Sequence, residues 1–392
     1  MGESSGTWRN WSVRLLRWVV RGFAVVFLVL VIAVGTITVV LPSWSRAQFD
    51  ALVALAITQR TPVIAPLARL VTYKPRIDEV AIAGEPTTIA RPGGGGGPWP
   101  AIVFVNGATR RGRYHPKVQR LTRGLARAGF LVAVPDLPGL RLGEITATTM
   151  EATVRVARAV AGRADVRGRR ISFYGVSVGA TLSLLAAESP ALTGRVRAVG
   201  GEAPWVDLEK VIRLATTGHY GLTPYRTDPY VRLAIARSLA AGLPQGRDRA
   251  RLLAMLEAIA DDDPHPLTRL RNEVRLHRAG RALVSLLLNT SPRRFAPLYA
   301  RLPPKLRRAV RLLSPLMHAR RISVPVELAS APHDRYFPPA ESRSLAKRSK
   351  HVRLTVTSTL DHAIPALSLR DIGDLVAFDQ FIVRFVHDAQ AH

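Results

Sequence analysis

The chain has 392 residues, enough to bury a large core in one principal domain. It contains no cysteine, which excludes disulfides, thiolate nucleophiles and cysteine-based metal sites. Its 56 Lys and Arg residues against 28 Asp and Glu give a net charge of +28. Because no nucleic-acid-binding motif accompanies this charge, nucleic acid is not an expected partner, and an anionic lipid surface is a candidate. An Arg-rich composition spread over ordinary solvated faces is the alternative.

The N-terminal region predicts a membrane anchor. Residues 22–41 form an uncharged apolar run of 20 residues, which would span about 30 Å as a helix, the thickness of the hydrocarbon core. Four arginines precede it: Arg9, Arg14, Arg17 and Arg21. The positive-inside rule therefore places residues 1–21 in the cytoplasm and the rest of a single-pass cell-membrane protein outside it. Cleavage near Ser43 or Ser45, as in a signal peptide, stays open.

Residues 42–75 predict a juxtamembrane helical linker. Two apolar stretches, Ala47–Ile57 and Val63–Tyr73, are separated by Thr61 and Pro62. Two interpretations are equally open: these stretches lie on the lipid surface, or they pack against the following domain.

Apolar strands alternating with helical segments follow from residue 76. The predicted strands are 80–83, 87–90, 101–105, 130–134, 171–176, 196–200, 324–328 and 352–357. A glycine run, residues 93–97, lacks the Lys-Ser/Thr of a phosphate loop and is predicted to be flexible. Apolar residues of the last helix, Phe378 and Phe385 among them, are expected in the core. The fold class is therefore α/β, with a mostly parallel central sheet flanked by helices.

The strand–helix alternation stops at residue 209 and resumes after residue 321. The segment between, 209–321, is predicted to be a helical cap over the mouth of the site. It carries 22 Lys and Arg residues against eight Asp and Glu, half of the net charge. If this charge surrounds the mouth, it favours anionic substrates. The core would then comprise residues 76–208 and 322–392.

One motif predicts the chemistry. Gly175-Val-Ser177-Val-Gly179 follows an apolar strand and precedes a run of helix formers. Such a turn holds the serine in a strained conformation with its hydroxyl exposed. A side chain at either glycine would push the helix away from the strand. Ser177 is the predicted nucleophile, and a serine nucleophile needs a base that a carboxylate orients. The loops after the last two predicted strands contain Asp334 and His362.

Together these motifs resemble the α/β-hydrolase superfamily, in particular its dienelactone-hydrolase-like and carboxylesterase-like branches. The resemblance covers residues 76–208 and 322–392. It implies the order nucleophile, acid, base, hence Ser177, Asp334 and His362. It also implies an oxyanion hole from the amide of Val178 and that of Ala108, with Gly107 as the alternative. Two departures are that Asn106-Gly107 stands where the family commonly has His-Gly, and that the cysteine nucleophile of dienelactone hydrolases is missing.

Several neighbours compete for these roles. Asp207 and Glu202 are rival acids, and Asp361 is expected to point elsewhere. His333, His219 and His115 are expected at the surface or the pocket rim. The acidic run 261–263 with His265 is interpreted as a loop after a helix. No metal or other cofactor is expected.

These observations predict a membrane-anchored serine hydrolase that cleaves a small-molecule or lipid-like ester through an acyl-enzyme. Two alternatives stay open. An acyltransferase would use the same residues and an envelope alcohol instead of water. A non-catalytic module would bind anionic surfaces through the cap.

Overall fold

The computed structural model describes residues 42–272, 275–362, 364–365 and 371–391. The predicted cytoplasmic segment 1–21 and transmembrane segment 22–41 lie outside the described residues. Within the described ranges, every helix is too short or too polar to cross a bilayer.

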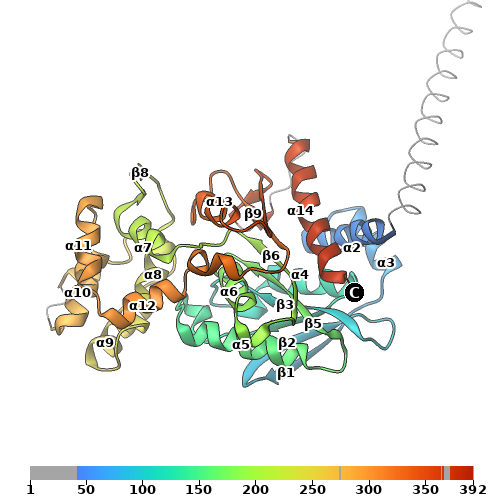
Figure 1. Cartoon of the computed structure of the whole chain (residues 1–392), viewed down its shortest axis with the longest axis horizontal. Coiled ribbons are helices and arrows are strands. Elements are labelled where there is room, and N and C mark those ends of the chain that lie inside the picture. Colours follow the sequence, from blue (N-terminus) through green and yellow to red (C-terminus); the bar gives the residue numbers. More distant parts are fainter. Residues whose placement is uncertain (1–41, 273–274, 363, 366–370, 392) are drawn as a thin grey trace, which may run out of the picture.

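An eight-stranded sheet forms the centre of the molecule (Figure 1). Its strands run in the order β1-β2-β4-β3-β5-β6-β9-β10. Strand β2 is antiparallel to both neighbours, and all other pairs are parallel, so the predicted mostly parallel sheet is confirmed. The strands are β1 (Arg76–Ile82), β2 (Glu85–Arg91), β3 (Trp99–Val105), β4 (Leu131–Pro135), β5 (Val166–Val176), β6 (Val196–Glu202), β9 (Val326–Ser330) and β10 (Val352–Val356).

Two helical layers cover the sheet, and the alternation of side chains along β3 shows how. Val103 and Val105 pack with helices α5 (Ala147–Ala161) and α6 (Val178–Ala187). Phe104, between them, points to the other face. Three helices form the layer on that face: α2 (Pro42–Gln59), α4 (Pro116–Arg127) and α14 (Ile372–Gln390). Burial on both faces explains why these strands are continuously apolar.

The juxtamembrane linker divides into two helices with different environments. Helix α2 packs against α4 and α14 and buries Ala47, Ala51 and Ala54, so this stretch lies on the domain (Figure 1). Helix α3 (Ile64–Val71) buries only its two alanines. Its larger apolar side chains, Leu67 and Leu70, are 55% and 82% exposed. The interpretation of a linker packed on the domain therefore holds for α2, whereas α3 presents an apolar surface.

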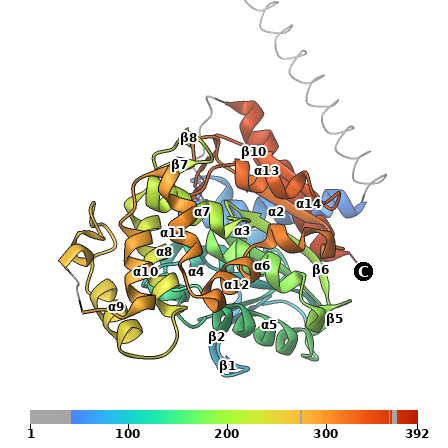
Figure 2. The ribbon, with the colours of Figure 1, turned by 60° about the vertical axis from the view of Figure 1, so that its left-hand side comes forward.

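The segment between β6 and β9 is largely helical and extends to one side of the sheet (Figures 1 and 2). Its helices are α7 (Leu208–Thr217), α8 (Pro229–Ala241), α9 (Arg247–Glu257), α10 (Arg278–Leu287), α11 (Phe295–Ala300) and α12 (Pro304–Leu312). A small hairpin of β7 (His219–Tyr220) and β8 (Thr223–Pro224) was not predicted.

Short elements complete the core. Helix α13 (Ala340–Ala346) precedes β10, and β11 (Leu360–Asp361) pairs with β12 (Ile364–Pro365) after it. The 3-10 turns are Gly112–Tyr114, Leu140–Leu142, Pro190–Leu192, Thr268–Asn272, Pro292–Arg294 and Pro315–Arg321. The phenylalanines predicted for the core, Phe378 and Phe385, are buried in α14, as expected.

Candidate active site

Ser177 stands at a sharp turn between β5 and α6. Its backbone has φ 56° and ψ −125°, a conformation that a residue with a side chain adopts only under strain. A Cβ on Gly175 would lie 2.5 Å from backbone atoms of Ala180 in α6. A Cβ on Gly179 would lie 2.0 Å from the carbonyl oxygen of Val105. The predicted steric requirement for both glycines is therefore confirmed.

Asp334 and His362 form a direct contact. His362 Nδ1 lies 2.9 and 2.8 Å from the two carboxylate oxygens of Asp334, which is almost completely buried. The same carboxylate accepts hydrogen bonds from the amides of Tyr336, at 2.7 Å, and Phe337, at 3.1 Å. Because its own loop fixes the carboxylate, the carboxylate can fix the orientation of the imidazole.

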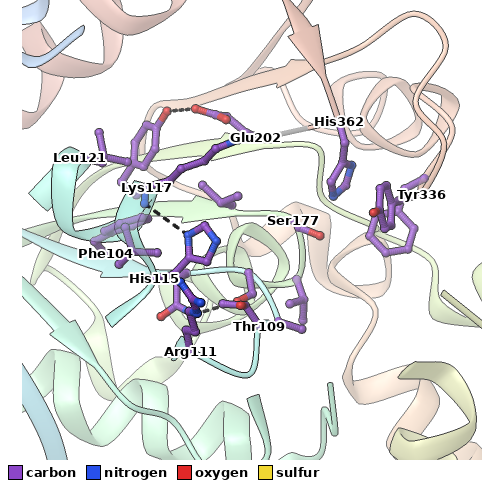
Figure 3. Close-up of a pocket in the computed structure, with 18 of the residues that line it drawn as sticks. Phe104, Thr109, Arg111, His115, Lys117, Leu121, Ser177, Glu202, Tyr336 and His362 are labelled. Atoms are coloured by element: carbon purple, nitrogen blue, oxygen red, sulfur yellow. Dashed lines mark hydrogen bonds between the residues drawn. The ribbon is translucent and has the colours of Figure 1, made fainter. Parts of the chain in front are cut away.

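Two aromatic rings contact the imidazole of His362. The Tyr336 ring stacks on the imidazole with 4.3 Å between centroids, and Phe337 meets it edge-on at 5.8 Å. His362 and Ser177 line the same cavity (Figure 3). Between these two described residues no hydrogen bond is present. Catalytic hydrogen bonds often tighten only when substrate binds, so the arrangement suits a serine–histidine pair.

The rival acids are engaged elsewhere. Asp207 caps the N-terminus of α7, accepting from the Lys210 amide at 3.4 Å, and pairs with the Lys210 ammonium at 3.3 Å. Glu202 accepts a hydrogen bond from the Tyr174 hydroxyl. Asp361 is exposed in β11. Asp334 is thus the carboxylate that contacts His362.

The other histidines lie where the sequence places them. His333 is exposed, and His219 Nδ1 lies 2.8 Å from the carbonyl of Thr217. His115 caps α4 and lines the cavity, where burial lowers its pKa. The expectation of surface or pocket-rim positions is confirmed.

The predicted oxyanion donors come from two adjacent backbone segments. Val178 is the first residue of α6, so its amide has no acceptor within that helix. A Cβ on Gly107 would lie 3.5 Å from the Ser177 Cβ, which brings the 106–108 turn beside the nucleophile. The Asn106 side chain donates to the Gly107 carbonyl at 2.8 Å and so shapes this turn locally. Val178, Gly107 and Ala108 all line the cavity.

The cavity has a volume of about 910 Å³ and reaches well beyond the serine. Its basic lining residues come from the core: Arg110, Arg111, Lys117 and Arg120. The cap contributes acidic and neutral residues instead: Asp228, Tyr230, Val231, Ala234, Ile235, Ser238, Asp261 and Asp262. The condition under which the cap would favour anionic substrates is therefore not met by the cap residues that line the cavity. Net charge in a sequence does not tell which way the charged side chains point.

Asp261 ties the cap to the loop that follows the oxyanion turn. It accepts from Arg110 Nε at 2.8 Å and from Arg237 Nη1 at 2.8 Å. Arg237 is only 1% exposed. The acidic run 261–263 follows α9 as a loop, as interpreted, and no group of metal ligands occurs in the described part of the chain.

Sequence reasoning missed Tyr336, Phe337, Tyr225 and Tyr174, and it considered Glu202 only as a rival acid. Tyr336 and Phe337 follow Asp334 directly, and that proximity was the available signal. Tyr225, from the cap, donates its hydroxyl to the Asp334 carbonyl, which nothing in the sequence indicates. Glu202 lines the cavity with Tyr174, and burial raises its pKa to about 7.

Comparisons with known proteins give distant structural likenesses. No protein-family profile and no curated protein sequence matches the chain. An acylaminoacyl peptidase is 14% identical over 79% of this chain and 40% of its own, with a TM-score of 0.46. An esterase of Pyrococcus furiosus is 12% identical over 81% and 92%, with a TM-score of 0.44. A Klebsiella pneumoniae protein assigned as a dienelactone hydrolase is 14% identical over 80% and 99%, with a TM-score of 0.43.

This chain spans less than half the length of the peptidase. Similarities this distant carry no argument about the site or its substrate. The sheet order with its antiparallel second strand, the strained turn at Ser177 and the contact of Asp334 with His362 belong to this chain itself. The resemblance to the α/β-hydrolase superfamily is confirmed on these grounds, and the chain has the α/β-hydrolase fold.

Proposed function

We propose that this chain is a membrane-anchored serine hydrolase that cleaves an ester. The observation that carries the proposal is the pairing of His362 with a buried Asp334 in the cavity that also holds Ser177 on a strained turn. This combination of nucleophile, base and orienting carboxylate is the requirement for acyl transfer through serine.

The reaction begins with attack of the Ser177 hydroxyl oxygen on the ester carbonyl carbon. His362 Nε2 takes the hydroxyl proton, and Asp334 stabilises the resulting imidazolium through Nδ1. Negative charge develops on the carbonyl oxygen, which the amides of Val178 and Ala108 bind. When the tetrahedral intermediate collapses, His362 returns the proton to the leaving alcohol. Water, activated by His362, then releases the acid from the acyl-enzyme.

A fluorophosphonate probe tests the nucleophile directly. We expect the full-length protein to be labelled and the Ser177→Ala variant to remain unlabelled, because the probe phosphonylates an activated serine and releases fluoride. Ser183→Ala is the matched control, since that hydroxyl is buried in α6 and bound to the Gly179 carbonyl. Equal labelling of the wild type and Ser177→Ala would refute the assignment.

Product analysis separates hydrolysis from its alternatives. With a p-nitrophenyl ester and added glycerol, hydrolysis yields the free acid, whereas acyl transfer yields a glycerol ester. A non-catalytic surface-binding module would turn over no ester and would bind anionic vesicles equally well with Ser177→Ala. The assembled contact between Asp334 and His362 favours the catalytic interpretation.

Membrane anchoring and an extracytoplasmic catalytic domain are part of the proposal. The uncharged run 22–41 and the preceding arginines support it, as does the exposed apolar face of α3 close behind. The absence of cysteine allows topology to be read from single introduced thiols. We expect a membrane-impermeant maleimide to label Leu222→Cys, 87% exposed, on intact cells, and Ser4→Cys only after lysis. If only Ser4→Cys were labelled on intact cells, the protein would have the opposite orientation in the membrane, with its N-terminus outside.

A further inference from the structure

The cavity at Ser177 continues into the helical layer formed by α2, α4 and α14. Four apolar side chains define this part, which we name the apolar lobe: Leu55 of α2, Leu121 of α4, Phe385 of α14 and Phe104 of β3. Each belongs to a different element, so the lobe lies between the helices and the sheet face that they cover. The chemistry of a Ser-His-Asp triad does not require the cavity to extend in this direction.

Two hydroxyl groups within this part of the cavity already have partners. The Thr58 hydroxyl donates to the Ala54 carbonyl at 2.7 Å. The Tyr174 hydroxyl donates to Glu202, and both are almost completely buried. Among the basic lining residues, Arg110, Arg111 and Lys117 are exposed, and Arg120 donates to the Thr58 carbonyl at 3.1 Å. The lobe therefore offers apolar surface and few free hydrogen-bonding groups, which suits an alkyl chain.

The position of the lobe relative to His362 decides which half of an ester it receives. His362 and Tyr336 lie on one side of Ser177, whereas Phe104, Leu121 and Glu202 lie on the other (Figure 3). The leaving alcohol must be close to His362, because the imidazole protonates its oxygen. The acyl group therefore extends away from His362, towards the lobe.

We infer that the apolar lobe binds the hydrocarbon chain of the acyl group, and that the substrate class is esters of medium- to long-chain fatty acids. This inference rests on the proposed ester hydrolysis. It adds a specificity residue outside the hydrolase core, since Leu55 belongs to α2, which precedes the sheet.

The test compares two substitutions on one helix. Leu55→Trp fills the lobe from α2, and Leu52→Trp introduces the same side chain three residues earlier, at a position 43% exposed and outside the cavity lining. The full-length protein in lipid nanodiscs is assayed with p-nitrophenyl acetate and octanoate. We expect wild type to prefer octanoate in kcat/KM by at least about tenfold, because each buried methylene adds binding energy. Leu55→Trp should abolish that preference, and Leu52→Trp should keep it.

An unchanged octanoate-to-acetate ratio in a folded Leu55→Trp variant would overturn the inference, as would a wild type that prefers acetate. If Leu55→Trp does not fold, Leu121→Trp fills the same lobe from α4 and decides the question. Failure of the proposed function has a different signature, namely no turnover of either ester and no fluorophosphonate labelling. In that case octanoate binding to Ser177→Ala, measured by calorimetry with and without Leu55→Trp, still decides whether the lobe holds the chain.

Discussion

Glu202 is an acidic residue in an apolar setting, one strand away from the nucleophile. It ends β6, and its carboxyl group is bound by the Tyr174 hydroxyl. Burial raises its pKa from 4.5 to about 7, although the hydrogen bond from Tyr174 acts in the opposite direction. Below neutral pH the group is therefore uncharged, which keeps the adjoining lobe apolar.

The raised pKa of Glu202 makes a prediction about stability. Between pH 4.5 and about 7 the folded protein holds a proton that the unfolded chain releases, so stability falls as pH rises, by at most about 1.4 kcal/mol per pH unit. The glutamine in Glu202→Gln is neutral at every pH, so the variant does not lose stability in this way as the pH rises. The Tm of the variant relative to wild type should thus increase from pH 5 to pH 7.5. Glu151→Gln, at an exposed position of α5, is the control. Parallel Tm curves for wild type and Glu202→Gln would contradict the assignment.

At the scale of elements, the turn between β5 and α6 depends on how closely α6 approaches β3. Gly179 lies in the first turn of α6, directly against the Val105 carbonyl. A methyl group there would have to displace either the helix or the strand that precedes the oxyanion turn. The same contact therefore positions both Ser177 and the 106–108 turn, the predicted nucleophile and the predicted source of an oxyanion donor.

Gly179→Ala should accordingly destabilise the protein by about 3 kcal/mol, the upper range for overpacking, because the obstructing atom is backbone that cannot rotate away. Gly373→Ala provides the contrast, since it lies in α14 with no atom within 4 Å of the added Cβ. Alanine is favoured over glycine in a helix, so its Tm should equal or exceed that of wild type. The Tm values of the two variants are compared with that of the wild type. If Gly179→Ala melted at the same temperature as the wild type, the steric argument would be contradicted.

The same elements show what could be predicted from the sequence. Ser177, Asp334 and His362 each follow an apolar strand, and since parallel strands end at one edge of a sheet, their proximity could be expected. The pair of Tyr174 and Glu202 could not, because it depends on the register that brings β5 beside β6. The packing of α2 was equally open, since alanine-rich apolar helices suit both a lipid surface and a protein core. Which way the charged side chains of the cap point also depends on tertiary packing, so it could not be predicted either.

At the scale of the whole molecule, Arg237 is one of the buried residues that join the cap to the core. This buried guanidinium donates to the carbonyls of Leu256 and Ile259 within the cap and to that of Leu142 in the core, at 3.1 Å. It also binds Asp261, which binds Arg110 of the core. Other side chains of the cap also bind the core, among them Ser238, which accepts from the Ile145 amide, and Tyr225, which donates to the Asp334 carbonyl.

Arg237→Met should therefore loosen the cap more than the core. The substitution leaves buried carbonyls unpaired, and removing one partner from such a network destabilises proteins by about 3–5 kcal/mol. Hydrogen exchange read by mass spectrometry should show faster exchange in α8 and α9, with β3 and β5 little changed. Arg232→Met is the control on the same helix, since within the described part of the chain Arg232 makes a single hydrogen bond, to the Leu287 carbonyl. Unaltered exchange in α8 and α9 would contradict this role of Arg237.

Because helix α2 packs against α4 and α14, the folded unit begins before the first strand of the sheet. A fragment that begins at Ile77 would retain the sheet, the triad residues and the cap, yet it would lack Leu55 and leave the buried faces of α4 and α14 open to water. A secreted or recombinant form intended to report the natural selectivity therefore has to begin at or before Pro42. Proteolytic release after α2 would yield a chain that keeps Ser177, Asp334 and His362 and has lost Leu55 from the cavity lining; if the proposed function and the inferred role of the lobe are right, its choice among esters changes.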